Sequence, residues 1–249
     1  MNFHNKVALI TGSTTGIGEE VAGQLHRHGA RVIIVSRSLH EARQKARSLS
    51  PDGKTAIGIE CDVADPEQVS SMINHAVDHF GRLDYAVNNA GTTGEHNKTI
   101  TEQTVDNWNN VISNTLSSVF YCMKYEIPEI LKSGGGSIVN LSAVNGLAGI
   151  PGLAPYTTAK HGIIGLTRSA ALEFACQGVR VNAVAPGYVS TPRINELPEN
   201  IISAFANSHP MKRMATMTEV ADFILFLLSE KSGFCTGGVY PVDGGYLAE

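Results

Sequence analysis

Cysteine is scarce in this chain, and its four copies lie far apart. Cys61, Cys122, Cys176 and Cys235 are the only cysteines in 249 residues, and no two form a Cys-x-x-Cys pair. This spacing argues against a cysteine metal centre and against a redox-active pair. We therefore expect no metal site, and we expect buried thiols in a protein of the reducing cytoplasm.

A surplus of one charge and long apolar runs are also missing. The net charge is −4 and the Lys and Arg residues are scattered, so we expect no surface for nucleic acid. The longest apolar run, residues 223–228, is far too short to cross a bilayer. The amino-terminal polar residues Asn2, His4, Asn5 and Lys6 lack the basic-then-apolar layout of a signal peptide. With 43% hydrophobic residues, the composition favours a globular protein that has a large core and binds no membrane.

Short β-branched apolar runs are present, and they alternate with longer amphipathic stretches. Most are almost uniformly apolar, which is typical of strands that helices cover on both faces. Strands are predicted at 7–10, 31–35, 56–60, 83–87, 137–141, 179–184 and around 239–242. Helices are predicted at 18–28, 39–48, 66–80, 106–131, 156–176 and 218–228. The alternation predicts an α/β fold in which residues 1–249 form one doubly wound Rossmann-type domain, with a seven-stranded parallel sheet and helices on both faces.

Glycine is concentrated just after the first predicted strand, in Gly12-Ser13-Thr14-Thr15-Gly16-Ile17-Gly18. Glycines at such a turn let the backbone approach a pyrophosphate, whose charge then lies at the amino end of the next helix. The spacing Gly-x-x-x-Gly-x-Gly differs from the Gly-x-Gly-x-x-Gly of the longer dehydrogenases. Purely structural glycines would give the same pattern, but its place after the first strand favours a phosphate-binding turn.

A second signal is Tyr156-Thr157-Thr158-Ala159-Lys160, read with Ser142 upstream. Residues four apart share one helix face, so Tyr156 and Lys160 can present their polar tips to the same point. The pKa of a tyrosine is ordinarily ~10, and a nearby cation lowers it. The pair is therefore interpreted as a tuned general acid/base. Together with the glycine turn, these residues resemble the short-chain dehydrogenase/reductase family. The resemblance extends over nearly the whole chain.

The resemblance implies a catalytic set of four residues. Tyr156 would exchange a proton with the substrate oxygen, and Lys160 would lower the pKa of that tyrosine and bind the nicotinamide ribose. Ser142 would hydrogen-bond the substrate oxygen and polarise a carbonyl. Asn114 would hold a water that continues the proton path from Lys160. The implied reaction is hydride transfer between a nicotinamide cofactor and a ketone or secondary alcohol.

The resemblance also implies a cofactor site along the ends of the strands. Its residues would be Gly12, Ser13, Thr14, Gly16, Ile17, Gly18, Asp62, Val63, Asn89, Ala90, Gly91, Tyr156, Lys160, Pro186, Gly187, Val189 and Thr191. Asp62 would lie against the adenine ring, although a role as a helix cap explains it nearly as well. Val189 and Thr191 would hold the nicotinamide carboxamide.

Cofactor choice depends on the end of the second predicted strand. A carboxylate there would bind the adenosine ribose hydroxyls and repel an added phosphate. This chain has Ser36-Arg37-Ser38 and no acid before Glu41, so two hydroxyls and a guanidinium would bind a ribose phosphate. Many NADP-dependent relatives carry a basic residue where this chain has Thr15, which weakens the case. NADP(H) is the preferred prediction, and NAD(H) stays open.

The substrate is the least determined part of the prediction. Residues 189–217 would form a substrate lid whose apolar members are Ile194, Leu197, Ile201, Ile202, Phe205, Met211 and Met214, although ordinary packing would explain these equally well. The first interpretation is an NADP-dependent carbonyl reductase or alcohol dehydrogenase. A 3-oxoacyl-(acyl carrier protein) reductase is the alternative, weakened by Ser133 and Gln177, where such relatives carry basic residues. A non-catalytic dinucleotide-binding regulatory protein is a third, weakened by the intact catalytic set.

The two long predicted helices, 106–131 and 156–176, carry apolar residues on more than one face. Relatives pair these helices across a two-fold axis and then pair dimers through the carboxy-terminal region. The resemblance therefore implies a homotetramer, with a homodimer as the second possibility.

Overall fold

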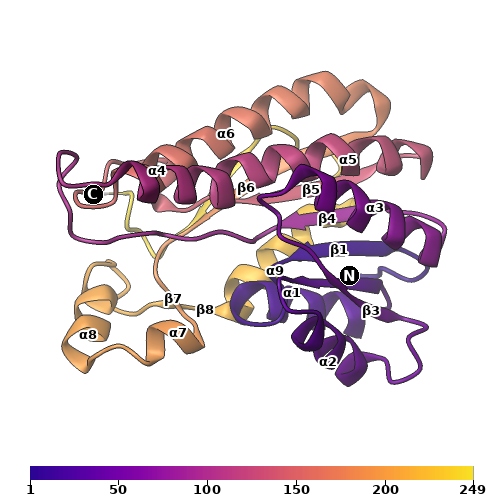
Figure 1. The fold of residues 1–249 in the computed structure, drawn as a ribbon, viewed down its shortest axis with the longest axis horizontal. Helices are drawn as coiled ribbons and strands as arrows, with labels where there is room; N and C mark the ends of the chain where they lie inside the picture. The colour runs from indigo at the N-terminus through magenta and orange to yellow at the C-terminus, as the bar shows by residue number, and fades with distance from the viewer. Residues whose placement is uncertain (249) are drawn as a thin grey trace.

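The computed structural model describes residues 1–248 and contains the seven-stranded parallel sheet that the sequence predicts (Figure 1). The strand order is β3-β2-β1-β4-β5-β6-β9, and all neighbours are parallel. The strands are β1 (Val7–Thr11), β2 (Arg31–Ser36), β3 (Ala56–Glu60), β4 (Tyr85–Asn88), β5 (Gly136–Leu141), β6 (Val179–Pro186) and β9 (Val239–Val242). Because the winding direction changes between β1 and β4, the loops there part and leave a crevice at the carboxyl ends of the strands.

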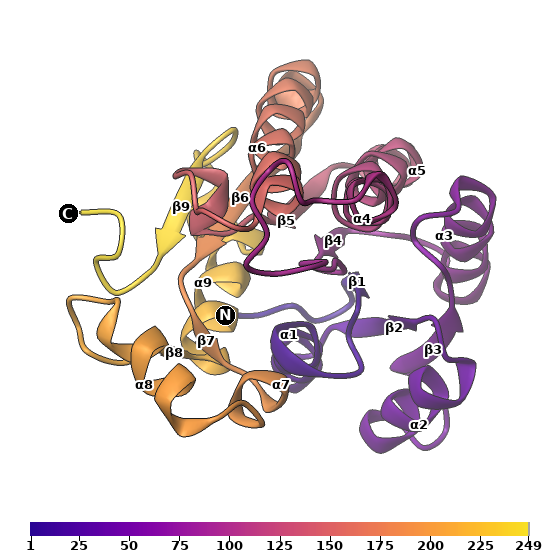
Figure 2. The same cartoon turned by 60° about the vertical axis from the view of Figure 1, so that its left-hand side comes forward.

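Helices cover both faces of the sheet (Figure 2). One face holds α1 (Gly16–Arg27), α2 (Leu39–Leu49) and α9 (Met217–Leu228), and the other holds α3 (Pro66–Phe80), α5 (Ser118–Lys132) and α6 (Ala154–Phe174). Ser38, Asp65 and Thr216 begin α2, α3 and α9, and each side chain accepts a hydrogen bond from a first-turn amide. No side chain caps α1 in this way, which leaves the amides of its first turn available to a ligand.

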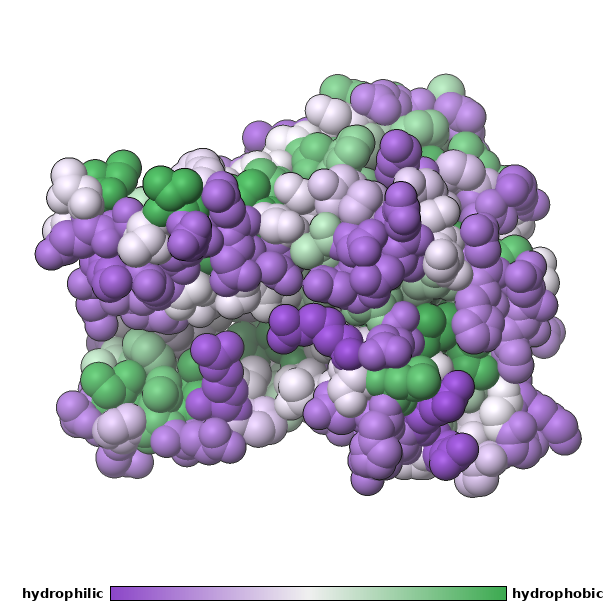
Figure 3. All heavy atoms as spheres, in the orientation of Figure 1, coloured by the Kyte–Doolittle hydropathy of each residue, from purple (hydrophilic) through white to green (hydrophobic). Residues whose placement is uncertain are grey.

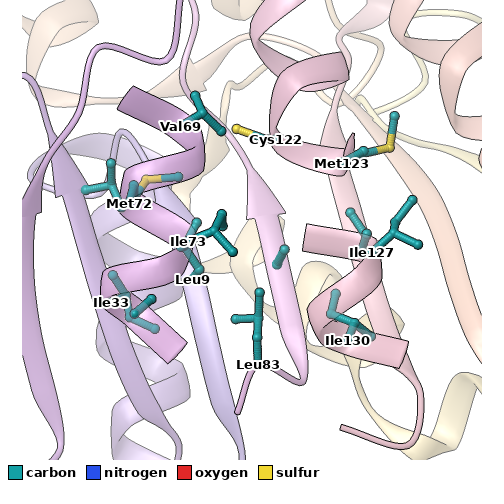
Figure 4. Close-up of a cluster of buried hydrophobic side chains, with 14 of the residues drawn as sticks. Leu9, Ile33, Val69, Met72, Ile73, Leu83, Cys122, Met123, Ile127 and Ile130 are labelled. Atoms are coloured by element: carbon teal, nitrogen blue, oxygen red, sulfur yellow. The ribbon is translucent and has the colours of Figure 1, made fainter. Parts of the chain in front are cut away.

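The core between the sheet and the second helical layer is dry and aliphatic (Figure 4). Its labelled members come from β1, β2, α3, α5 and the segment before β4, and they are Leu9, Ile33, Val69, Met72, Ile73, Leu83, Cys122, Met123, Ile127 and Ile130. All are buried. Each such buried side chain stabilises the folded state by roughly 1.5–3 kcal/mol. This layer therefore holds α5 against the strands.

The helix predicted at 106–131 exists, but it is not one α-helix. It consists of α4 (Val105–Val111), a π-helical segment η1 (Ile112–Ser117) and α5. A π-helical turn holds an extra residue, and such turns are frequent at functional sites. The hydrophobic period of the sequence does not reveal one extra residue, so the prediction missed the interruption.

The segment 189–217 contains short elements that the sequence did not predict. They are β7 (Val189–Ser190), α7 (Pro192–Asn195), α8 (Glu199–Asn207) and β8 (Ala215–Thr216), and β7 pairs with β8 as a small second sheet. Short helical turns η2 (Val144–Gly146), η3 (Ala175–Gln177) and η4 (Glu230–Ser232) complete the described elements. In Figure 1, α7 and α8 stand apart from the main sheet, at the lower left.

Two of the four thiols differ from expectation. Cys61 and Cys122 are buried as predicted, but Cys176 is exposed and Cys235 is partly exposed. Both lie outside the main helices and strands, Cys176 in η3 after α6 and Cys235 shortly after η4. Across residues 1–248, no helix combines the length and the apolar character that crossing a membrane requires.

Candidate active site

The predicted site residues gather at the carboxyl edge of the sheet. β1 ends at Thr11, β4 at Asn88, β5 at Leu141 and β6 at Pro186, and the glycine turn, Asn89, Ser142 and Gly187 follow these ends. Figure 3 shows the molecule hollowed on this side, between the segment of α7 and α8 and the layer formed by α4, α5 and α6. Ligands of open parallel sheets bind at such an edge.

The glycine turn after β1 fits a pyrophosphate. Gly12 and Gly16 have φ angles of 62° and 65°, in the left-handed region that favours glycine. A methyl group on Gly18 would lie 2.4 Å from the Gly12 carbonyl oxygen, so only glycine lets α1 start this close to the turn. In front of Gly16 the space is open, with Thr191 Cγ2 as the nearest atom at 3.9 Å from such a methyl group. Open space and uncapped amides together match an anion site at a helix amino end.

Ser13 and Asn89 hold this turn from behind. Ser13 Oγ donates to Ile10 O at 2.7 Å and accepts from Val35 N at 3.0 Å, so its hydroxyl is used within the fold. Asn89 Nδ2 donates to the carbonyl oxygens of Thr11 and Gly12, each at 3.0 Å. The neighbouring Ala90 N donates to Thr11 Oγ1, and Gly91 lies against Thr115. Thr14 and Ile17, also predicted, are partly exposed on the turn itself.

The residues after β2 make more internal contacts than the sequence suggested. Ser36 Oγ donates to Glu41 Oε2 at 3.3 Å, and Ser38 Oγ accepts from Glu41 N at 3.3 Å as the cap of α2. The predicted cage of two hydroxyls is therefore engaged by Glu41. Arg37 is exposed and takes part in none of the ion pairs of residues 1–248.

Asp62 is not the cap of α3. That role belongs to Asp65, whose Oδ1 accepts from Glu67 N and Gln68 N. Asp62 Oδ1 instead accepts from Ala64 N at 3.0 Å in a turn, and Val63 beside it is buried. The helix-cap explanation for Asp62 is therefore wrong, and its place against an adenine ring stays a prediction.

The segment after β6 is tied to the lid by a residue that the sequence did not single out. His209 Nε2 accepts from Tyr188 N at 3.1 Å, while its Nδ1 donates to Phe205 O at 2.8 Å. A methyl group on Gly187 would lie 2.5 Å from His209 Nε2, so Gly187 allows this close approach. The ring of Tyr188 stacks on that of Phe205, with centroids 4.0 Å apart. Val189, which follows Tyr188, is buried, and Thr191 caps α7.

Ser142, Tyr156 and Lys160 meet where β5 ends and α6 begins. Ser142 Oγ donates to Lys160 O at 3.0 Å, which joins the turn after β5 to the helix. Lys160 Nζ donates to Leu141 O at 2.5 Å and lies 5.4 Å from the centroid of the Tyr156 ring. Lys160 is only 4% exposed, so its amine is largely shielded from solvent.

Burial shifts both titrating groups toward their neutral forms. It raises the pKa of the Tyr156 hydroxyl to about 12 and lowers the pKa of the Lys160 amine to about 7. A cationic Lys160 that lowers the pKa of Tyr156 was the expectation from the sequence. In this structure burial is instead the cause of both shifts, and the Lys160 amine donates to the Leu141 carbonyl.

Asn114 lies within the π-helical segment η1. Its Nδ2 donates to Asn110 O at 2.9 Å and to Asn110 Oδ1 at 3.0 Å, and its own carbonyl accepts from Ser118 Oγ at 2.8 Å. The side chain thus binds a carbonyl of α4, in the turn just before the π-helical segment. The proposed water contact of Asn114 stays a prediction.

Gly146 is a site residue that the sequence pattern did not single out. A methyl group there would lie 2.2 Å from Ser142 Oγ and 2.8 Å from Lys160 O. Gly146 therefore leaves the room in which the serine hydroxyl meets the helix. The signal was present in the sequence as a glycine four residues after the candidate serine, but only the turn η2 explains it.

A family model described as enoyl-(acyl carrier protein) reductase matches residues 12–247, which is nearly the whole chain. Curated dehydrogenases and reductases match along the same length. The chain belongs to the short-chain dehydrogenase/reductase family. As a member, it is an oxidoreductase that interconverts a CH–OH group and a carbonyl with a nicotinamide dinucleotide.

Similar family members include two alicyclic alcohol dehydrogenases. Cyclohexanol dehydrogenase of Acinetobacter sp. (strain SE19) is 42% identical over 247 residues, which cover 99% of this chain and 97% of that protein. Cis-4-hydroxycyclohexanecarboxylate dehydrogenase of Sinomonas cyclohexanicum is 39% identical over 246 residues, covering 99% and 98%. The 3-oxoacyl-[acyl-carrier-protein] reductase FabG of Staphylococcus aureus is 36% identical over 241 residues, covering 96% and 97%.

Solved short-chain reductases share the whole fold. ElxO with NADP bound superposes with a TM-score of 0.92 at 37% identity, covering 98% of this chain and 99% of that chain. Levodione reductase has a TM-score of 0.92 at 32% identity, covering 99% of both chains. The doubly wound fold predicted from the sequence is therefore confirmed.

Proposed function

We propose that this enzyme interconverts a secondary alcohol and a ketone on a six-membered carbon ring, with Tyr156 as the general acid/base. One observation carries the proposal: Ser142, Tyr156 and Lys160 meet at the sheet edge that also holds the uncapped amino end of α1. The ring is suggested by two relatives, named for cyclohexanol and for cis-4-hydroxycyclohexanecarboxylate.

The proposed lid, residues 189–217, supports an apolar substrate. No residue of α8 is buried, although that helix carries Ile201, Ile202 and Phe205. Leu147, on the turn after β5, is 39% exposed, and Tyr188 presents a stacked ring. Ligand pockets are mostly apolar with a few polar groups that fix orientation. Such walls suit a hydrocarbon ring whose oxygen points to Tyr156.

The basic residues of the lid are largely committed elsewhere. Arg213 forms two hydrogen bonds to Glu219, and Lys212 Nζ donates to Asn207 O at 3.1 Å. Arg193 is exposed on α7 and belongs to none of the ion pairs within residues 1–248. A neutral ring is therefore favoured over an anionic one, with Arg193 as the residue to test if a ring carboxylate is preferred.

In the proposed mechanism the dinucleotide supplies only the hydride acceptor or donor. Tyr156 removes the proton of the alcohol oxygen, or delivers it to the oxygen formed from a ketone. Ser142 has one hydroxyl proton, which in this structure is donated to Lys160 O. It must therefore turn toward a ketone oxygen to polarise it, whereas it can accept from an alcohol without giving up that bond.

Lys160 would set the protonation of the site near neutrality. Burial places its pKa at about 7, so a modest gain of a hydrogen-bond acceptor would make it cationic. A cationic amine close to the ring of Tyr156 would stabilise the tyrosinate and thereby lower the tyrosine pKa from its buried value. Asn114 would continue the proton path through a water.

NADP(H) is the proposed cofactor, and Arg37 would bind its ribose phosphate. Glu41 would oppose this preference. The exposed guanidinium of Arg37 suits a ribose phosphate. The Glu41 carboxylate, hydrogen-bonded to Ser36, would instead accept a ribose hydroxyl and repel the phosphate. NAD(H) is therefore the cofactor to compare in every assay.

Reduction of a 3-oxoacyl thioester on acyl carrier protein is the second candidate function, favoured by the FabG relative. The surface at the end of α5 does not support docking of an acidic carrier. Ser133 Oγ is engaged with Glu129 O and Leu83 N, and Lys132 pairs with Glu129 at 2.7 Å.

A substrate panel separates these functions. Cyclohexanol and ring-substituted cyclohexanols would be oxidised with NADP and NAD, and the matching ketones and acetoacetyl thioesters reduced with NADPH and NADH. We expect the highest kcat/KM for a cyclic alcohol or ketone. Turnover mainly of the thioester would replace the proposal with the second candidate.

A further inference from the structure

The centre of the molecule contains a carboxyl group that the mechanism does not use. Glu126 lies on α5 and faces the sheet, and its side chain has no solvent exposure. None of the ion pairs formed within residues 1–248 involves it. A carboxylate left without a cation in such a place is strongly disfavoured.

Glu126 contacts the strand end that leads to the cofactor loop. Asn88, the last residue of β4, donates from Nδ2 to Glu126 Oε2 at 3.1 Å and to Asn140 Oδ1 at 3.0 Å. Asn140 Nδ2 in turn donates to Thr167 Oγ1 of α6 at 2.9 Å. This polar chain runs from α5 across β4 and β5 to the helix that carries Tyr156 and Lys160.

Two oxygens of the chain lack a donor. Both amide protons of Asn88 are used, yet Asn88 Oδ1 and Glu126 Oε1 are buried and have no hydrogen-bond partner. A single proton on Glu126 Oε1, donated to Asn88 Oδ1, would give both oxygens a partner. Unpartnered, each would cost about 1–3 kcal/mol.

Neighbouring groups do not supply the missing donor. Ser118 Oγ donates to Asn114 O, and Thr11 Oγ1 is directed to Val87 O. The small cavity that borders Asn88, Ser118 and Cys122 has no room for the centre of a water molecule.

We infer that Glu126 is a neutral carboxylic acid, that it donates its proton to Asn88 Oδ1, and that this acid–amide pair positions the Asn88–Gly91 segment behind the glycine turn. The pair satisfies both orphan oxygens with one proton. Its effect reaches the cofactor site through Asn89, which follows Asn88 and holds the carbonyls of Thr11 and Gly12.

The electrostatic surroundings agree with a neutral acid. Burial raises the pKa of Glu126 to about 8, and the hydrogen bond from Asn88 opposes this only in part. The titrating group beside it is Cys122 on its own helix. Cys61 after β3 lies next to that thiol, and burial raises the pKa of both thiols. In Figure 4, Cys122 lies among apolar side chains of α3 and α5. No positive charge is at hand to ionise Glu126.

The sign of the pH effect follows from linkage. An acid whose pKa is higher in the folded than in the unfolded state keeps its proton on folding, so stability is greatest below the unfolded pKa. It falls as the pH rises from about 4.5 toward 8, the folded value. Glu126→Gln keeps a donor and an acceptor in the same shape and cannot ionise, so it should remove this fall.

The test combines a spectroscopic and a stability measurement on the whole enzyme. Infrared difference spectra of wild type minus Glu126→Gln, near pH 6, should contain the carbonyl band of one protonated carboxylic acid, which disappears above about pH 8. Glu129→Gln serves as the matched control, since Glu129 lies on the same helix and pairs with Lys132. Its difference spectrum should contain only carboxylate bands.

The melting temperature of Glu126→Gln should also exceed that of wild type by a margin that grows between about pH 5 and about pH 8. A carboxylate signal from Glu126 near pH 6 would overturn the inference, whatever the activity of either variant. If Glu126→Gln does not fold, NMR titration of wild type labelled with 13C at the glutamate carboxyls distinguishes the neutral acid from the carboxylate.

Discussion

Lys160 Nζ lies 5.4 Å from the centroid of the Tyr156 ring and donates to the Leu141 carbonyl at 2.5 Å. The amine is therefore held between the end of β5, just before Ser142, and the residue proposed as acid/base. Burial lowers the pKa of the Lys160 amine to about 7 and raises the pKa of the Tyr156 hydroxyl to about 12. The site is thus poised so that a single change of hydrogen bonding alters which group carries charge.

Lys160→Met tests this electrostatic role. We expect kcat to fall by about 10²–10⁴-fold, since a positioned acid/base without its cation loses the matched pKa. The substitution should also change how the stability of the fold depends on pH. A lysine whose pKa is depressed on folding lets wild type gain stability as the pH rises from about 7 to about 10, and the variant should lack this gain in thermal melts. An unchanged kcat with a flat wild-type stability profile would contradict the role.

Arg37 and Glu41 should act oppositely on cofactor preference. Arg37→Asp should lower kcat/KM for NADPH relative to NADH by about 10²-fold, because like charges brought together cost several kcal/mol. Glu41→Gln should raise the same ratio, since it removes the carboxylate bound to Ser36. Steady-state kinetics with both cofactors measure the ratios. If wild type prefers NADH, the role assigned to Arg37 is wrong.

Gly146 should be required for the serine to reach its place. Gly146→Ala puts a methyl group 2.2 Å from Ser142 Oγ, so the hydroxyl must move. A misplacement of about 1 Å can cost about 10²-fold in rate. Gly149→Ala is the matched control, because nothing lies within 4 Å of the added methyl group. Equal activity of the two variants would show that the contact does not matter.

The proposed homotetramer depends on fewer exposed residues than the sequence suggested. Val111, Val119, Met123, Ile163, Ala170 and Ala171 are all buried within a single chain. Phe120 on α5 and Leu172 on α6 remain exposed, at 47% and 85%. Light scattering should give a multiple of 26.5 kDa at micromolar concentration, and Phe120→Asp with Leu172→Asp should reduce it. A wild-type mass of one chain would reject both tetramer and dimer.

The parallel sheet was predictable because its strands are uniformly apolar runs with helix-length spacers, as in Val32 to Val35 before α2. The glycine turn and the Tyr156–Lys160 pair were visible because their chemistry depends on local spacing. The contacts of His209 with Tyr188 and Phe205 join residues that no hydrophobic period marks. The sequence pattern likewise does not show the hydrogen bond from Ser36 to Glu41 or the π-helical turn at Asn114. Both depend on backbone geometry.

The most direct test of the central claim is the oxidation of cyclohexanol by Tyr156→Phe, measured with NADP and NAD beside a fluorescence titration of cofactor binding. The substitution removes one hydroxyl with little change in volume, so the cofactor should still bind. We expect kcat to fall by about 10²–10⁴-fold with both cofactors. Turnover near the wild-type rate, with cofactor binding intact, would contradict the assignment of Tyr156 as the acid/base.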